Sequence, residues 1–231
     1  TFAKAQNISV GSDAIWLFAK DLNNDGRVDL VVSDYNSNAV YLLTNVTQAL
    51  TTSVSFTTTT LVTGINGPIG LTVEDFNGDG SPDLAIETYR TTGTILFYRN
   101  ISTQGGAISF TNTGVAINTT IGGYSLAVAD VDLDGLPDVI QGGRDDNSNT
   151  NSIYVTRNIS SGSTISFSTA VTFSPGSVSR QIYASDIDGD GKPDLITANY
   201  NANGYSVLRN ISSGPGNIAF TTSSVDFPGG G

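Results

Sequence analysis

Residues 186–194 read Asp-Ile-Asp-Gly-Asp-Gly-Lys-Pro-Asp, which places carboxylates at positions 1, 3, 5 and 9 of the stretch and glycine at position 6. Apolar runs flank the stretch at residues 181–184 and 195–198. A hard divalent cation needs six to eight oxygen ligands, and alternate side chains of a tight loop can converge to supply them. Glycine permits the sharp turn, and the carbonyl of position 7 can add another oxygen. The stretch therefore predicts a cation-binding loop.

The same loop occurs four times along the chain. The other copies read DLNNDGRVD at residues 21–29, DFNGDGSPD at residues 75–83 and DVDLDGLPD at residues 130–138. We number them loops 1 to 4 in chain order and call them the metal loops. Their first residues, Asp21, Asp75, Asp130 and Asp186, are 54, 55 and 56 residues apart. A fixed period of this length is typical of a repeat architecture.

Each repeat reads as a series of short strands. Apolar residues ahead of each loop have a period of two, which predicts a strand. A second strand follows the loop, a turn rich in Asn, Ser and Gly leads to a third, and a phenylalanine opens a fourth. No segment has a helical period, so the chain is predicted to be all β. The equivalent residues of the first strand are Leu17, Leu71, Leu126 and Ile182, then Ala19, Val73, Val128 and Ala184, and the phenylalanines are Phe56, Phe110, Phe167 and Phe220.

Four short antiparallel strands per repeat are typical of a β-propeller blade. We predict blades at residues 11–64, 65–120, 121–175 and 176–231, with residues 1–10 as the last strand of a preceding blade. Two forms remain open for the four complete blades, a ring closed in an unusual way and part of a larger ring, and we favour the second. Two chains could also combine into one eight-bladed ring, because an open array exposes sheet faces that invite association.

Composition and charge narrow the functional classes. The 231 residues include no cysteine and no histidine, which excludes disulfides, thiolate zinc sites, imidazole ligands and a Ser-His-Asp triad. Of the 21 acidic residues, loops 1 and 2 hold three each and loops 3 and 4 hold four each, so the net charge of −11 mostly reflects the loops. No cluster of Lys and Arg could neutralise phosphates, so nucleic-acid binding is not expected.

The sequence also indicates whether the chain has a membrane-spanning helix or a signal peptide. No apolar run approaches the roughly 20 residues that a membrane helix requires. The opening residues Thr-Phe-Ala-Lys are neither an initiator methionine nor a signal peptide, so we expect a processed or excised piece.

The units at residues 19–30, 73–84, 128–139 and 184–195 resemble FG-GAP repeats, also called VCBS-type repeats. This family occurs in the propeller of integrin α subunits, in secreted bacterial surface proteins and in some fungal lectins. The resemblance covers essentially the whole chain. It implies a loop that joins the first two strands of each blade and binds calcium. Relatives generally have seven or more blades, so the blade number departs from the pattern.

The resemblance implies four Ca²⁺ sites, and Ca²⁺ is preferred over Mg²⁺ because the loops offer many protein ligands. Loops 3 and 4, with four carboxylates each, are expected to bind more tightly than loops 1 and 2. The implied side-chain ligands are Asp21, Asn23, Asp25 and Asp29; Asp75, Asn77, Asp79 and Asp83; Asp130, Asp132, Asp134 and Asp138; and Asp186, Asp188, Asp190 and Asp194, joined by the position-7 carbonyls of Arg27, Ser81, Leu136 and Lys192.

Two other interpretations of the loops can be weighed on their residues. An EF-hand needs glutamate at position 12 and flanking helices, whereas the metal loops have Val32, Ile86, Gln141 or Thr197 there. The second alternative is an Asx-rich turn that holds itself by side-chain to backbone hydrogen bonds. Such a turn has no need of three or four mutually repelling carboxylates, so a cation site is favoured.

An Asn-x-Ser/Thr pattern recurs at the end of the third predicted strand. The pattern could accept N-linked glycans. A repeated asparagine that caps the end of the strand explains it as well, and we favour this structural role. The asparagines are Asn45, Asn100, Asn158 and Asn210, with two further patterns at Asn7 and Asn118.

Two residues depart from the repeat and are candidate ligand-binding residues. Trp16 is the only tryptophan, and it could stack on a sugar ring or pack between blades. Arg144 lies in an enlarged turn of the third blade, residues 142–149, which is either a recognition site or a variable surface loop.

The sequence favours an extracellular calcium-binding β-propeller that acts as a structural or adhesion module of a secreted or cell-surface protein. Extracellular calcium would keep such sites loaded at dissociation constants of about 0.1 to 1 mM. The alternative is a carbohydrate-binding, lectin-like propeller. An enzyme acting on glycosides is less favoured, and no catalytic residue is expected, because nearly all close carboxylates belong to the loops. The expected partner is a protein or glycan on a cell surface or matrix, without membrane insertion, and exposed blade edges could self-associate.

Overall fold

The computed structural model of the chain describes residues 6–49, 51, 53–89, 93–145, 150–176, 178–200, 204–221 and 225–228. For residues 124, 144, 145, 150 and 225–228 it describes the backbone alone. The described residues form sixteen strands and no helix, so this part of the chain has no helix that could cross a membrane. The prediction of an all-β chain is confirmed.

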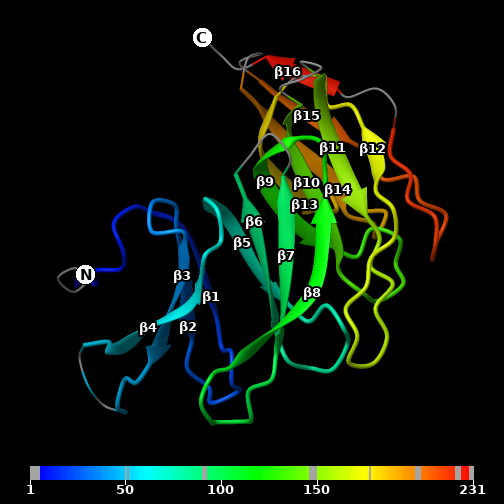
Figure 1. Cartoon of the computed structure of the whole chain (residues 1–231). Coiled ribbons are helices and arrows are strands. Elements are labelled where there is room, and N and C mark those ends of the chain that lie inside the picture. Colours follow the sequence, from blue (N-terminus) through cyan, green and yellow to red (C-terminus); the bar gives the residue numbers. More distant parts are fainter. Residues whose placement is uncertain are drawn as a thin grey trace.

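The strands form four antiparallel sheets of four strands each, and consecutive strands pair within each sheet (Figure 1). The sheets are the four blades of a β-propeller, which confirms the predicted fold class. Blade 1 contains β1 (Ala14–Lys20), β2 (Asp29–Asp34), β3 (Ala39–Asn45) and β4 (Phe56–Thr63). Blade 2 contains β5 (Pro68–Glu74), β6 (Asp83–Thr88), β7 (Thr94–Asn100) and β8 (Phe110–Asn118). Blade 3 contains β9 (Gly122–Ala129), β10 (Asp138–Asp145), β11 (Thr150–Thr156) and β12 (Val171–Phe173), and blade 4 contains β13 (Ser179–Ser185), β14 (Asp194–Asn199), β15 (Gly204–Leu208) and β16 (Val225–Pro228).

Each metal loop closes the hairpin between the first and second strands of its blade, and the last loop residue begins the second strand. The second strands β2 and β6 are buried almost throughout. Blades 1 and 3 cover the two faces of β6, whereas β2 has blade 2 on one face and the segment of residues 6–10 near the other. The outermost strand β4 is rich in threonine and mostly exposed. The position-9 aspartate of each loop therefore enters the most buried part of its blade.

The fourth strand of blade 3 differs from the sequence prediction: Phe167 forms an isolated bridge with Asn158, and β12 begins only at Val171, so the expected start was wrong here. In blade 4 Phe220 forms the same bridge with Asn210, and residues 222–224, which precede β16, lie outside the described ranges. In blades 1 and 2 the fourth strand begins at the expected phenylalanine but contains a register shift. An outermost strand pairs on one side only and can bulge at little cost. In blade 3 the interruption, residues 168–170, is long enough to separate the bridge from the strand.

Apolar clusters fill the spaces between consecutive blades, so the blade interfaces stabilise the array. The first strands β1, β5, β9 and β13 contact one another in chain order, and residues from all four line one cavity near the common axis. Representative cluster members are Val31 and Leu71 for blades 1 and 2, Phe97 and Val139 for blades 2 and 3, and Ile140 and Ile182 for blades 3 and 4.

The array of four blades is open over the described part of the chain. No apolar cluster of the described residues joins blade 4 to blade 1. Residues 6–10 form no strand, and residues 1–5 lie outside the described ranges. The assignment of residues 1–10 to a preceding blade therefore stays a prediction, as do the blade boundaries.

Candidate metal centres

The four metal loops share one tight turn. Their position-6 glycines have φ between +83° and +91°, a left-handed conformation that other residues rarely adopt. In loop 3 the Asp130 carboxylate accepts the backbone N–H groups of Asp134 at 3.0 Å and Gly135 at 2.9 Å. Loops 1, 2 and 4 have the same pair of bonds. These are the bonds that an Asx-rich turn would have, so other features must distinguish a turn from a cation site.

The position-9 aspartate is buried in every loop, with 0 to 1% of its surface exposed. In loop 3 the two oxygens of Asp138 accept the backbone N–H groups of Val131 at 3.0 Å and Asn158 at 2.8 Å. The other three loops have equivalent pairs of bonds. Burial raises the pKa of Asp138 and of Asp83 to about 7, and the other carboxylates of each loop add to the rise. A cation in the loop would favour the charged form of these groups.

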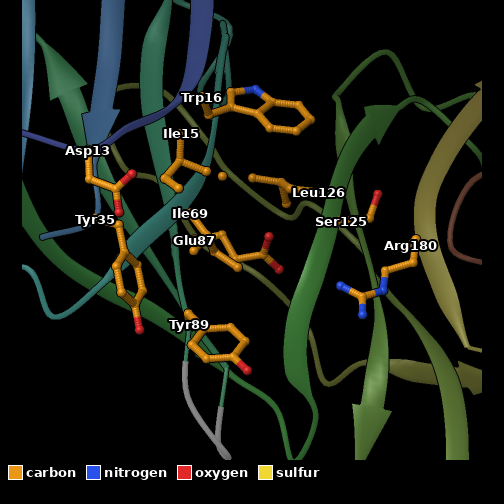
Figure 2. A pocket seen from close by; sticks show the side chains of 11 residues that line it. Asp13, Ile15, Trp16, Tyr35, Ile69, Glu87, Tyr89, Ser125, Leu126 and Arg180 are labelled. Atoms are coloured by element: carbon orange, nitrogen blue, oxygen red, sulfur yellow. The ribbon is translucent and has the colours of Figure 1, made fainter.

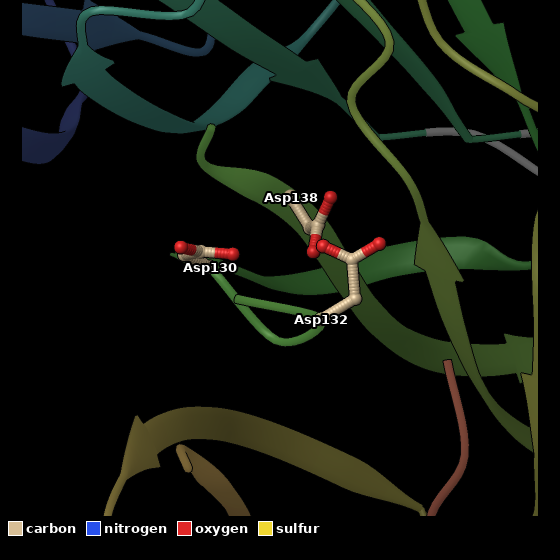
Figure 3. Close-up of side chains that lie close together, drawn as sticks. All are labelled: Asp130, Asp132 and Asp138. Atoms are coloured by element: carbon tan, nitrogen blue, oxygen red, sulfur yellow. The ribbon is translucent and has the colours of Figure 1, made fainter. Parts of the chain in front are cut away.

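Three carboxylates converge in each of the last two loops. One oxygen each of Asp130, Asp132 and Asp138 lies within 4.8 Å of the others, and Figure 3 shows these side chains around one point. Asp186, Asp188 and Asp194 form the equivalent group in loop 4. Loops 1 and 2 have asparagine at position 3, so an amide oxygen stands where loops 3 and 4 have a carboxylate.

Two buried oxygens at position 3 have no hydrogen-bond donor among the described residues. They are Oδ1 of Asn23 in loop 1 and Oδ1 of Asp132 in loop 3. A buried oxygen without a partner costs about 1–3 kcal/mol. A hard cation would satisfy these oxygens, and the donor set consists of carboxylate and amide oxygens, which Ca²⁺ prefers. The residues present therefore fit a divalent cation better than a self-sufficient turn.

Loops 3 and 4 each form ion pairs with an arginine that directly follows the third strand of the same blade. Arg157 donates from Nε to Asp132 Oδ2 at 2.6 Å and from Nη2 to Asp134 Oδ2 at 2.7 Å. Arg209 makes the same two contacts with Asp188 and Asp190. The equivalent Arg99 donates instead to the carbonyl of Ser163. Each of these arginines directly precedes an asparagine of the Asn-x-Ser/Thr pattern, at Asn100, Asn158 and Asn210.

The position-5 aspartates of loops 3 and 4 lie outside the groups of converging carboxylates. Asp134 and Asp190 each accept a backbone N–H from position 7 and an arginine N–H, and neither belongs to the converging groups. All the ligand assignments stay predictions. The same holds for the position-7 carbonyls of Arg27, Ser81, Leu136 and Lys192.

The asparagine of the glycosylation-like motif joins two blades. Asn158 donates its Nδ2 hydrogens to the carbonyls of Phe76, in the loop of the preceding blade, and Pro137, in its own loop, at 2.9 and 3.0 Å. Asn100 and Asn210 are also buried and make equivalent bonds across their interfaces. The amide nitrogens are therefore used by backbone carbonyls, which agrees with the structural role that we favoured for these three.

Trp16 lies at a cavity of about 510 Å³ that residues from all four blades line (Figure 2). Tyr35, Tyr89 and Glu87 line it from blades 1 and 2, and Arg180 lines it from blade 4. Trp16 also packs against the apolar cluster between blades 1 and 2, as the packing role expected for it requires, and its role in ligand binding stays a prediction.

Arg144 lies in β10, but its side chain and residues 146–149 of the enlarged turn lie outside the described part.

Glu87, a carboxyl that was not among the candidate residues expected from the sequence, is 1% exposed. Gln141 of blade 3 donates to Glu87 Oε1 at 2.8 Å and accepts from Thr119 at 2.6 Å. Burial raises the pKa of Glu87 to about 7. Gly70 and Gly123 provide its space, since a Cβ at either would lie within 3 Å of a Glu87 oxygen. A lone glutamate in a strand gives no such signal from sequence.

Comparison with known proteins adds one match. Residues 21–86 and 142–197, together more than half of the chain, match a family described as FG-GAP-like repeat. The first stretch contains loops 1 and 2, and the second contains loop 4. A search of curated proteins found no match.

Proposed function

The chain belongs to the FG-GAP-like repeat family, and from this premise we propose that it is an extracellular calcium-binding β-propeller with a structural or adhesive role. The observation that carries the proposal is the convergence of Asp130, Asp132 and Asp138, together with the buried Asp132 oxygen that lacks a donor. A calcium ion is the partner that this oxygen set fits best.

Bound calcium would offset the repulsion among the loop carboxylates and link the first strand of a blade to the second. Different residues of the loops would have different roles in holding the ion. The position-9 aspartate, fixed by two backbone N–H groups, holds its oxygens in place. The arginine of loops 3 and 4 neutralises the outer oxygens at positions 3 and 5. Because the chain has no cysteine, four such links would replace disulfides.

The proposed location follows from the proposed ion. Sites that bind calcium at about 0.1 to 1 mM are loaded outside cells and largely empty inside them. The expected partner is a protein or glycan on a cell surface or matrix. We assign no catalytic residue, since the clustered carboxylates are engaged in the loops.

Calorimetric titration with CaCl₂ and with MgCl₂, after removal of divalent ions, tests the calcium proposal. Four sites that prefer calcium are expected. Asp130→Asn should remove or strongly weaken one of them. Glu74→Gln is the matched control, because Glu74 lies near loop 2 but pairs with Lys20 and is not a proposed ligand. Absence of calcium binding to the folded wild-type chain would overturn the proposal.

A second candidate function is carbohydrate binding, and the cavity at Trp16 favours it. An aromatic face, a buried carboxyl at Glu87 and a guanidinium at Arg180 surround one space there (Figure 2). This combination suits a sugar, which stacks on aromatic rings and hydrogen-bonds to polar groups. We infer no particular sugar.

Tryptophan fluorescence gives a direct test, since Trp16 is the sole tryptophan. A glycan array in calcium and in chelator would identify candidate sugars. A binding sugar should then change the Trp16 emission in titration, and Glu87→Gln should weaken that change. An array without a hit in calcium would remove this candidate and leave the structural or adhesive role.

A further inference from the structure

Metal loops 1 and 3 contact the following blade through its hairpin between the third and fourth strands, which we call the outer hairpin. The outer hairpins comprise residues 101–109 in blade 2, 159–166 in blade 3 and 211–219 in blade 4. Asn23 in loop 1 donates from Nδ2 to the carbonyl of Gly106 at 2.7 Å. Gly216 donates its backbone N–H to Asp132 Oδ2 in loop 3 at 2.6 Å. Both contacts reach the side chain at position 3 of the loop, which is a proposed calcium ligand.

The length of the outer hairpin differs between the blades. It has nine residues in blades 2 and 4 (101–109 and 211–219) and eight in blade 3 (159–166). Gly106 and Gly216, which make the contacts, each lie six residues after the asparagine that precedes their hairpin. The shorter hairpin of blade 3 makes no hydrogen bond with Asn77, the position-3 residue of loop 2, whose side chain bonds instead to Asp79 of its own loop.

The position-3 Oδ1 atom has a different environment where the outer hairpin contacts the loop. In loops 1 and 3, Oδ1 of Asn23 and of Asp132 is buried and has no donor among the described residues. In loop 2, Oδ1 of Asn77 accepts the position-5 N–H at 2.9 Å. Loop 4, which no blade follows in the described part of the chain, has the same bond to Asp188 Oδ1 at 3.2 Å. The unpaired oxygen thus occurs in the two loops that an outer hairpin contacts.

The arginine of loops 3 and 4 does not explain this difference. Arg157 donates to Asp132 Oδ2 in loop 3, and Arg209 donates to Asp188 Oδ2 in loop 4. Both loops therefore have the arginine, but only in loop 3 does Gly216 add a second donor to the same oxygen. The two oxygens of a carboxylate point in different directions, so donors that fix Oδ2 also orient Oδ1. Such outer hydrogen bonds orient metal ligands and commonly change metal affinity by 10- to 100-fold.

We propose that the outer hairpin of blade 4 is part of the calcium site of loop 3, and that of blade 2 part of the site of loop 1. Gly216 and Gly106 are positioning residues: each holds one atom of the position-3 side chain and keeps the other free for the ion. These two sites are therefore built from two blades. Because such coupling is reciprocal, calcium in loop 3 also stabilises the contact of the hairpin with Asp132. This inference rests on the proposed calcium binding and adds the residues that prepare the site.

Shortening the outer hairpin of blade 4 tests the proposal. Residues 215–217, Pro-Gly-Asn, are replaced by Ser-Thr, the sequence of blade 3 at residues 163–164. An NMR titration with CaCl₂ that follows the backbone amide of each position-6 glycine resolves the loops, with Gly135 reporting on loop 3. The replacement should weaken calcium binding to loop 3 about tenfold and leave loops 1 and 2 unchanged. Ser213→Ala is the matched control, because Ser213 bonds to Asn217 within the same hairpin and not to loop 3. It should leave the affinity of loop 3 unchanged.

Amide hydrogen exchange of the wild-type chain gives a second test that needs no altered hairpin. Calcium should slow the exchange of the Gly216 N–H, which donates to Asp132, and leave that of Gly162 in the outer hairpin of blade 3 unchanged. Unchanged calcium affinity of loop 3 in the folded replacement variant, or Gly216 exchange that calcium does not slow, would overturn this inference alone. A wild-type chain that binds no calcium would overturn the proposed function and this inference with it.

Discussion

Asn158 in blade 3 donates a side-chain hydrogen bond to the carbonyl of Phe76 in loop 2, 82 residues earlier, at 2.9 Å. The N–H of Phe76 in turn donates to Asp83, the position-9 aspartate of loop 2. One residue thus joins the metal loop of a blade to the interface with the next blade. Stability in a repeat array comes largely from its interfaces. A mutation or a bound ion in a metal loop is therefore expected to change the stability of the interface with the neighbouring blade.

The first prediction concerns this bond. Asn158→Ala should lower the free energy of unfolding by about 2–3 kcal/mol, because it leaves buried carbonyls without a donor. Asn45→Ala should cost about 1 kcal/mol, because Asn45 is less buried and bonds no other blade in the isolated chain. Urea unfolding in calcium measures both. Equal losses would contradict the assignment of an interface role to Asn158.

The second prediction ranks the loops. Loops 3 and 4 should bind calcium more tightly than loops 1 and 2, because position 3 is aspartate instead of asparagine. Asp132→Asn should weaken loop 3 about three- to tenfold, and Asn23→Asp should strengthen loop 1 by a similar factor. Site-resolved calorimetry on these variants checks the order. Tighter binding in loops 1 and 2 would refute the ranking.

The third prediction distinguishes the contribution of Arg157 to stability from that of bound calcium. Arg157 is the main counter-charge of Asp132 and Asp134 when no cation is bound. Arg157→Gln should therefore destabilise the chain by about 1–2 kcal/mol in chelator and by less in calcium. Arg99→Gln, whose guanidinium contacts no metal loop in the described structure, should have the same effect in both conditions. Thermal unfolding of both variants in both conditions would show the difference, and parallel losses would contradict it.

The fourth prediction concerns pH. Burial raises the pKa of Glu87 from 4.5 to about 7, so the folded state holds a proton that the unfolded state releases between these values. The contribution of Glu87 to stability therefore falls as pH rises from about 4.5 to 7, by at most about 3 kcal/mol. The Glu87→Gln variant has no group that titrates at this position, so it should not lose this stability as the pH rises. Its melting temperature relative to wild type should be higher at pH 8 than at pH 5. An unchanged difference would contradict the burial of a proton at Glu87, and the exposed Glu74→Gln serves as the control.

Local patterns in the sequence were sufficient for the fold and for the location of the loops. The alternation that includes Leu71 and Ile182 identified the first strands, and the spacing of the aspartates identified the hairpins that follow them. These features depend on residues close together in the chain, which a short pattern contains. The start of the fourth strand in blade 3 was predicted wrongly because, after the bridge at Phe167, ladder pairing with β11 begins only at Val171, and this pairing does not depend on the phenylalanine itself.

The parts of the site that depend on distant contacts were not predictable in the same way. Arg157 reaches Asp132 across 25 residues, and Glu87 meets Gln141 across 54 residues. Neither pairing leaves a local pattern. Leu17 is 55% exposed, whereas Leu71, the leucine at the same register position of blade 2, is 1% exposed and packs in the apolar cluster between blades 1 and 2.

The central claim is that calcium in the metal loops stabilises the folded blades, and thermal unfolding with and without calcium tests it most directly. In excess EDTA the melting temperature should fall by about 10 °C or more, since each loaded site adds stability that chelation removes. Calcium should restore it, and magnesium should restore it less. An identical melting temperature in calcium and in EDTA would contradict the claim.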